Sequence, residues 1–383
     1  MTVCLLLIML WSAHTSADEE LPRHALACIK GGNPSRGTAS PNAIAVTALS
    51  FSRDSQFLVG SRANGQIVVW DSTKRKTIET TTVDQACWTS RVFFRSPGHT
   101  FLATRGRELS SWTIEGDKLT RISGSQIVRD SKFFERADEF RSECLALSIS
   151  KDDRFAAFGF DVALGKIGGA PSPTLKVLDL RSGEPTKIDD ETANRIGSHK
   201  VPSVAFAPDC KVLAYAHASG PKSTGGGVFF FSLSDAPSPA ALPFRGGIPC
   251  TVDFSADGLQ VAAGGGDLVA HFLHPEELSQ KNNLYVWNYQ TQAVIFQQNH
   301  PGVVSSISFS PDGRTLVSAS NEQVVRIWDI SLGKQLAELK GHRSSVRVVA
   351  VSPDGKLLAS GSTDSSIMVW SMQSILQNGA NTP

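Results

Sequence analysis

The chain has 383 residues, of which 41% are hydrophobic, 8% aromatic and 19% charged, and its formal net charge is +1. This composition is that of an ordinary globular protein and excludes a largely disordered chain. The balance of 37 basic against 36 acidic residues also lacks the basic surplus of a dedicated nucleic-acid binder. We therefore expect no nucleic-acid partner.

The first predicted segment is a targeting signal over residues 1–17. Val3 to Trp11 form an apolar run of nine residues, which suits a signal-peptide core and is too short to span a bilayer. Small residues precede Asp18, where we place the mature start, but no Lys or Arg precedes the run. We therefore expect a periplasmic or secreted protein with no stable membrane insertion. A cytoplasmic protein is the alternative if the signal is not used.

Five cysteines follow the predicted signal: Cys28, Cys87, Cys144, Cys210 and Cys250. Their odd number leaves at least one unpaired, and their wide, single spacing is not that of a disulfide scaffold or a zinc site. We interpret them as small buried hydrophobic residues.

An internal repeat dominates the rest of the chain. Stretches that start at Phe51, Phe309 and Val351 align without a gap. Each one predicts an apolar strand, a tight turn at Pro-Asp-Gly or a related sequence, a second strand, a polar turn, and a third strand that closes near a Trp. Four weaker copies start at Phe94, Ile149, Phe206 and Phe254. The chain thus contains seven copies of one β-rich unit.

The repeat resembles that of the WD-repeat β-propeller family, named for the Trp-Asp pair found here at Trp70-Asp71 and Trp328-Asp329. The resemblance implies an all-β fold, a single seven-bladed β-propeller of four-stranded antiparallel blades. The propeller would span residues 18–373, and residues 374–383 would form a short C-terminal tail.

The last copy matches the family most completely. It has the Gly-His pair at Gly341-His342, the turn Asp at Asp364 and the closing Trp at Trp370. The resemblance implies that His342, Asp364 and Trp370 join one structural hydrogen-bonded network within their blade. The other copies depart from this pattern, since the position of the turn Asp is taken by Asn64 in the first copy and Glu322 in the sixth.

The two ends of the repeat array are complementary. The outer-strand sequence LAELKGH, which follows Trp328, has no counterpart after Trp370, but it recurs near the N-terminus as LACIKGG from Leu26 to Gly32. A ring that pairs its own ends leaves no exposed sheet edge. We therefore predict that the ring is closed by the N-terminal strand, with residues 26–30 completing the seventh blade.

Four insertions interrupt the regular spacing. Three lie between the second and third strands of the third, fourth and fifth copies, and one precedes the third copy. In antiparallel blades these connections open on the same end of the ring, so we expect a recognition surface over blades two to five. Neutral loop lengthening is the alternative, because longer loops cost little entropy.

The insertion at Ser125–Phe140 mixes cations with aromatic residues, which are enriched at protein-binding hot spots. Its candidate contacts are Arg129, Lys132, Phe133, Phe134, Arg136 and Phe140. The alternative is that the phenylalanines pack beneath their own loop. The insertions at 162–173 and 220–227 are rich in glycine but lack the strand and helix of a phosphate cradle.

The longest insertion, Asp267–Asn283, has further candidate contacts: His271, His274, Glu276 and Glu277. Histidines three apart share a helix face, as a metal pair requires, but Pro275 predicts that a helix starts after them. We therefore expect no metal here and interpret the two histidines as partner contacts, which could respond to pH.

No pattern of a nucleophile with its base is found, and the Asp and Gly residues of the turns are explained by turn geometry. We expect a non-catalytic scaffold without a cofactor that acts as a monomer within a protein complex. The alternative is a propeller enzyme, or a binder of small ligands or metal, that uses the channel mouth and the His271/His274 loop.

Overall fold

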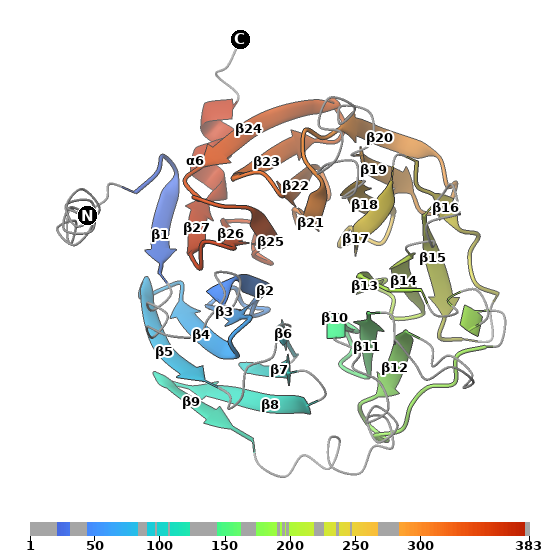
Figure 1. Cartoon of the computed structure of the whole chain (residues 1–383), viewed down its shortest axis with the longest axis horizontal. Helices are drawn as coiled ribbons and strands as arrows, with labels where there is room; N and C mark the ends of the chain where they lie inside the picture. Colours follow the sequence, from blue (N-terminus) through green and yellow to red (C-terminus); the bar gives the residue numbers. More distant parts are fainter. Residues whose placement is uncertain are drawn as a thin grey trace, which may run out of the picture.

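Seven antiparallel sheets stand like blades around a common axis in the computed structural model (Figure 1). The residues that the structure describes are 21–30, 44–82, 90–95, 98–105, 108–122, 144–161, 174–189, 192–193, 196, 199–217, 226–234, 237–245, 247–266 and 283–379. The predicted all-β, seven-bladed propeller is confirmed. Within these residues no helix is long and apolar enough to cross a membrane.

Blades one to six take their strands in chain order from the axis outwards, and blade seven adds β1 as its outer strand. Blades one and two comprise β2 (Val46–Phe51), β3 (Phe57–Arg62), β4 (Gln66–Asp71), β5 (Lys76–Thr82), β6 (Ser90–Phe94), β7 (Thr100–Arg105), β8 (Glu108–Glu115) and β9 (Lys118–Arg121). Blades three and four comprise β10 (Cys144–Ile149), β11 (Phe155–Phe160), β12 (Leu175–Asp179), β13 (Ser203–Phe206), β14 (Val212–His217), β15 (Gly227–Ser232) and β16 (Leu242–Pro243).

The remaining three blades follow the same order. Blades five and six comprise β17 (Ile248–Phe254), β18 (Gln260–Gly266), β19 (Asn283–Asn288), β20 (Val294–Asn299), β21 (Val304–Phe309), β22 (Thr315–Ser320), β23 (Val324–Asp329) and β24 (Lys334–Lys340). Blade seven comprises β25 (Val346–Val351), β26 (Leu357–Ser362), β27 (Ile367–Ser371) and, from the other end of the chain, β1 (Ala25–Ile29).

The hydrophobic core is divided among the blade interfaces. Among the described residues, seven clusters of buried side chains are found, and each joins two neighbouring blades. The cluster between blades seven and one, for example, packs Val46 and Trp70 against Ile367 and Val369. A blade therefore buries its apolar faces only against its neighbours, which is why the ring has to close.

Strand β1 closes the ring as predicted. It pairs antiparallel with β27, with Ala27 opposite Val369 and Ile29 opposite Ile367 (Figure 1). The first residues of the predicted tail belong to a helix, α6 (Met372–Gly379), and residues 380–383 lie outside the described residues. Met372 and Ile375 are buried against blades six and seven, and the sequence analysis missed this helix because its apolar face is so short.

Blades three and four depart from the predicted four strands. Blade three has three described strands, and its outer position holds only the isolated bridge Leu178–Pro185. In blade four, β16 pairs with only two residues of β15. Proline explains both cases, because Pro185 and Pro243 lack the N–H that a ladder needs.

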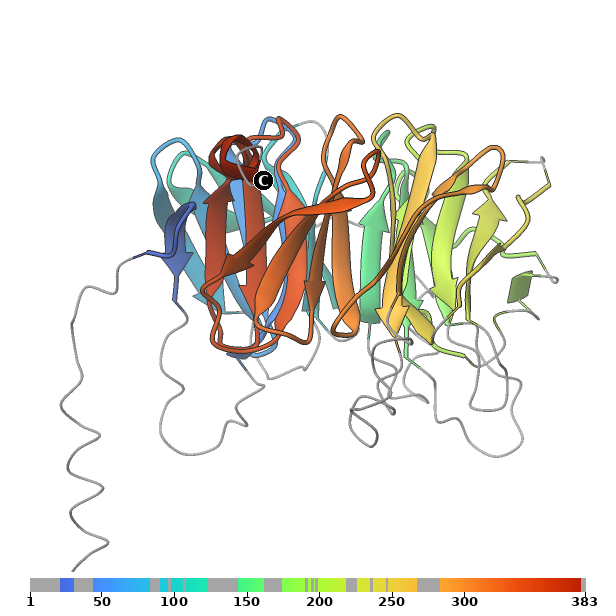
Figure 2. The same cartoon turned by 90° about the horizontal axis from the view of Figure 1, so that it is seen from above.

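The two ends of the ring differ in the connections that they carry. At one end, which we call the connection face, first strands begin, second strands pass into third strands, and fourth strands lead to the next blade. At the opposite end, the turn face, tight turns join first to second strands and third to fourth strands. Figure 2 shows the ring from its edge, with α6 following β27 at the turn face.

Candidate functional site

The connection face is where the predicted insertions leave the sheets. The three insertions within blades leave from the ends of β11, β14 and β18, and the fourth leaves from β9. In blade five, Gly266 at the end of β18 lies opposite Ile248 at the start of β17, and Asn283 lies opposite Asn299. The register of the described strands thus places the four departure points at one end of the ring.

The predicted contact residues on these insertions lie outside the described residues. This is the case for Arg129, Lys132, Phe133, Phe134, Arg136 and Phe140, and for His271, His274, Glu276 and Glu277. Their roles stay predictions. Among the described residues, no group of three His, Cys, Asp or Glu side chains is placed to hold a metal ion.

A central channel of about 530 Å³ runs along the axis and is lined by the first strands of all seven blades. Close to the connection face, five of these strands contain a β-bulge, at Thr47, Leu145, Cys250, Ser305 and Arg347. A bulge re-aims the side chain of its extra residue, and all five residues line the channel. The chemistry of the channel mouth is therefore set by one residue from each of several distant repeats.

Two arginines give the channel mouth its charge. Arg91 of β6 spans three blades, since its Nε donates to the carbonyl of Leu145 (2.6 Å) and its Nη1 to that of Thr47 (2.9 Å). Arg347 of β25 is exposed. Burial raises the pKa of the nearby Cys250 thiol to about 11, although Lys200 and Arg347 act in the opposite direction. A raised pKa favours the protonated thiol at neutral pH, and the protonated form is the less nucleophilic one.

Asp253 of β17 is the acidic residue of the channel lining. Its Oδ1 accepts a hydrogen bond from its neighbour Phe254 N (2.9 Å), and its Oδ2 accepts one from Phe309 N of blade six (3.2 Å). Burial raises the pKa of its carboxyl to about 7, although the two N–H donors oppose this rise. Sequence reasoning overlooked this residue.

Serine holds the equivalent position in other repeats. Ser50 Oγ accepts from Phe94 N (3.1 Å), and Ser308 Oγ accepts from Val351 N (3.2 Å), each across one blade boundary. The ionisable carboxyl of Asp253 therefore accepts the inter-blade hydrogen bond that a serine hydroxyl accepts in these repeats. The signal in the sequence was Asp253 itself, one residue before the end of the first strand, where the first, third and sixth copies have Ser.

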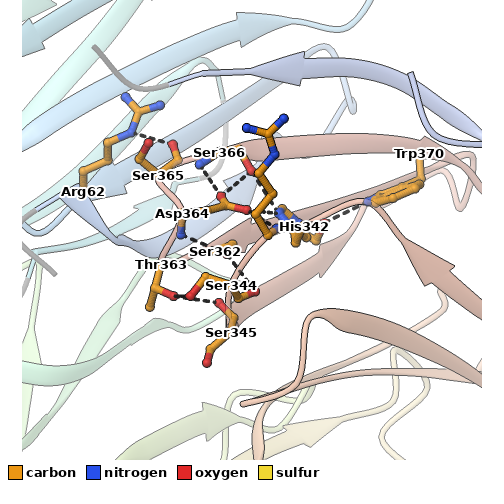
Figure 3. A network of polar contacts seen from close by, with 12 residues as sticks. Arg62, His342, Ser344, Ser345, Ser362, Thr363, Asp364, Ser365, Ser366 and Trp370 are labelled. Carbon is orange, nitrogen blue, oxygen red and sulfur yellow. Dashed lines mark hydrogen bonds and ion pairs between the residues drawn. The ribbon is translucent and has the colours of Figure 1, made fainter. Parts of the chain in front are cut away.

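The structural network of blade seven is brought together by β26, β27, the connection between them and the connection from β24 to β25 (Figure 3). Ser360 Oγ accepts from Trp370 Nε1 (2.8 Å) and contacts His342 Nε2 (2.7 Å). His342 Nδ1 contacts Ser366 Oγ (2.9 Å) and lies 3.4 Å from Asp364 Oδ2. Sequence analysis named His342, Asp364 and Trp370 but missed the two serines that connect them.

Asp364 also holds the local backbone. It accepts from Ser366 N (2.8 Å) and Arg343 N (2.7 Å). Burial alone would raise the pKa of its carboxyl, but the hydrogen bonds from His342, Ser366 and Arg343 lower it far below the usual range. These side chains are occupied with one another, so this network rigidifies its blade and is not a candidate binding site.

Blade six repeats part of the network without the aspartate. Ser318 Oγ accepts from Trp328 Nε1 (2.8 Å) and contacts His300 Nε2 (3.2 Å). Burial, assisted by the positive charge of Arg326, lowers the pKa of His300 to about 3. Glu322, at the position of the missing Asp, pairs instead with Arg326 (2.5 Å).

Comparison with known proteins gives the same assignment for the repeat. The model of the family described as "WD domain, G-beta repeat" matches residues 37–71, 291–329 and 333–371. The second and third matches each cover the outer strand of one blade and the first three strands of the next.

Curated relatives extend the similarity along the chain. Protein FIZZY-RELATED 3 of Arabidopsis thaliana is 22% identical over 335 residues, which is 84% of this chain and 54% of the relative. A WD repeat-containing protein, SL1-17, of Schistosoma mansoni is 26% identical over 185 residues, 47% of this chain and 53% of the relative. A B-type cell cycle switch protein, ccs52B, of Medicago truncatula is 22% identical over 297 residues, 74% of this chain and 49% of the relative. The chain spans about half the length of these relatives.

Proposed function

Because the chain belongs to the WD-repeat family of β-propellers, whose members generally act as protein-binding scaffolds without catalysis, we propose that it binds a protein partner through its connection face. The observation that carries this proposal is the position of the four long connections. They leave the sheets at one end of the ring and are grouped over blades two to five. A rigid ring that displays its longest connections on one side suits macromolecular recognition.

The channel mouth opens on the same face and adds fixed donors to it. Arg91 is held by the carbonyls of Thr47 and Leu145, so its guanidinium loses little freedom when a partner binds. Arg347 is exposed at the same mouth. We propose that the partner contacts this mouth together with the connections around it.

We also propose which residues make the main contacts on two of the connections. Phe133 and Phe134, flanked by Arg129 and Arg136, combine apolar area with bidentate donors, as residues at hot spots do. The loop with His271 and His274 supplies polar contacts at the rim. The proposed compartment is periplasmic or extracellular, and mass spectrometry of the mature N-terminus tests it, since a start at Asp18 supports export and a start at Met1 contradicts it.

The experiment that tests the proposed surface is affinity capture followed by chemical cross-linking. The intact protein is compared with a variant in which residues 125–140 and 267–282 are replaced by short Gly-Ser linkers. We expect the variant to lose its partner while its thermal unfolding is unchanged, because the strands on either side of each replaced segment are kept. Cross-links should fall on connection-face residues such as Arg347.

A matched control changes the opposite end of the ring. Leu332 in a turn of blade six is 64% exposed, and Leu332→Ser should leave capture unchanged. If the shortened variant captured the same partner as the intact protein, or if cross-links fell on the turn face, the proposed surface would be wrong.

A further inference from the structure

A second, smaller cavity opens where the channel meets the turn face. Its volume is about 300 Å³, and it lies where the first strands of blades one, two, three and seven end. The cavity shares Lys151 with the lining of the central channel. It lies at the end of the ring opposite to the proposed partner surface, so the inference below does not rest on the proposed function.

Three cationic side chains lie among the mostly apolar lining of this cavity. Arg53, Arg95 and Lys151 line it, one from each of blades one, two and three, and Asp153 is the acidic residue among the lining. Arg53 is held in place, because its Nη2 donates to the carbonyl of Lys151 (2.9 Å). This contact joins the turns of blades one and three and brings two of the three cations together.

Arg95 has a buried hydrogen-bond donor that finds no acceptor among the described residues. Its Nε is buried and makes no hydrogen bond within the described residues. A buried guanidinium N–H without an acceptor costs free energy comparable to a lost hydrogen bond, so such a group calls for an explanation. An anion seated in the cavity would supply the missing acceptor.

Two nearby turn carboxylates already accept hydrogen bonds within their own turns. Asp54 accepts from Ser52 Oγ (2.6 Å) and contacts His99 Nε2 (2.7 Å). Asp152 accepts from Ser150 Oγ (2.6 Å) and Arg154 N (3.1 Å). These acids therefore organise the turns that present the cations.

Three other repeats have proline at the turn position where blades one and three have a cation. Two residues after the end of the first strand, blades four, six and seven have Pro208, Pro311 and Pro353. At the same position blades one and three have Arg53 and Lys151. Pro208 packs against Gly258 and Pro311 against Gly355, each in the next blade. Blades one and three thus have a cation at a position where these three repeats have proline.

We propose that this cavity is a binding site for a phosphate group. Three cations that approach from three turns suit a tetrahedral oxyanion with several acceptor oxygens better than a planar carboxylate. The volume accommodates a phosphate together with a small organic group, so the phosphate belongs to a small phosphate ester or to a phosphorylated side chain.

Isothermal titration with inorganic phosphate at constant ionic strength, set with potassium chloride, tests the site. Saturable binding is expected for the intact protein. Arg95→Gln and Lys151→Gln should each weaken it about tenfold, because each removes a charge-assisted hydrogen bond. Lys151→Arg should retain binding, and Arg314→Gln, on the turn of blade six at the same face, should bind phosphate as the intact protein does.

Lys151 is exposed, so its variants keep the test decisive even if Arg95→Gln fails to fold. A second titration with a phosphoserine tetrapeptide separates the two sources, since tighter binding than inorganic phosphate indicates a phosphorylated chain and equal or weaker binding a small ester. The proposal is overturned if phosphate produces no more heat than chloride, or if Arg314→Gln loses binding as strongly as Lys151→Gln.

Discussion

Blades six and seven differ from blades three and four in how they complete their sheets. The first pair has four full strands and a His–Ser–Trp contact in each blade. The second pair has an outer position filled by a bridge at Pro185 and by two paired residues of β16. The comparison teaches that the inner three strands are sufficient to join a blade to the ring. The outer strand is the part of this fold that can vary.

The outer strand of blade seven is the exception, because it also closes the ring. Deleting residues 21–30 should destabilise the protein by several kcal/mol, since the half-buried Ala27 and Ile29 of β1 pack at the boundary between blades seven and one. Thermal unfolding measures the loss, and hydrogen exchange should show the largest increase in β27. If blade seven tolerated the deletion, as blade three tolerates its short outer strand, the role of β1 in closure would be refuted.

The Trp at the end of the third strand is a second difference between blade seven and blade four. Trp370 is completely buried and donates to Ser360, so Trp370→Ala should cost about 3–5 kcal/mol. Trp370→Phe should cost less, because it keeps most of the packing and loses mainly the hydrogen bond.

Blade four supplies the control for this measurement. Phe231, at the matching place in β15, is buried without such a hydrogen bond, and Phe231→Ala should cost no more than Trp370→Ala. Denaturant unfolding gives these differences, provided that the m-values agree. A loss below about 1 kcal/mol for Trp370→Ala would contradict the blade assignment.

The boundary between blades five and six can be compared with other blade boundaries, because there the carboxyl of Asp253 accepts the hydrogen bond that serine accepts elsewhere. Its folded pKa of about 7 lies above the value of 3.8 for a free carboxyl. The native state therefore keeps a proton that the unfolded state releases, and the stability from this group, complete below about pH 4, is lost as the pH rises to about 7. Asp253→Ser removes this dependence and keeps an acceptor for Phe309, as Ser308 does for Val351.

The expected gain in unfolding free energy from Asp253→Ser is on the order of 4 kcal/mol at pH 8 and close to zero at pH 4. Chemical unfolding across this pH range checks the sign. Ser308→Ala, which removes the acceptor without changing any charge, is the matched control and should lower stability equally at both pH values. A gain for Asp253→Ser that did not grow with pH would show that the carboxyl is already ionised at neutral pH.

The sequence alone determined the ring. The seven repeats, the strand near Leu26 that completes the last blade, and His342, Asp364 and Trp370 could all be predicted because each is a local pattern that recurs at a regular spacing. Alternation and turn residues act within about twenty residues, so a single chain displays them directly.

Only the tertiary structure decided which side chains meet at the axis. Arg91, Asp253 and Arg347 come from three repeats and carry no shared pattern, and Arg53, Arg95 and Lys151 are likewise far apart in the sequence. A closed ring brings one short stretch of every blade to the same channel, so residues that are far apart in the sequence together determine the chemistry there. The short outer pairing of blades three and four was also decided by the tertiary structure. Whether a segment with proline pairs depends on the strand beside it.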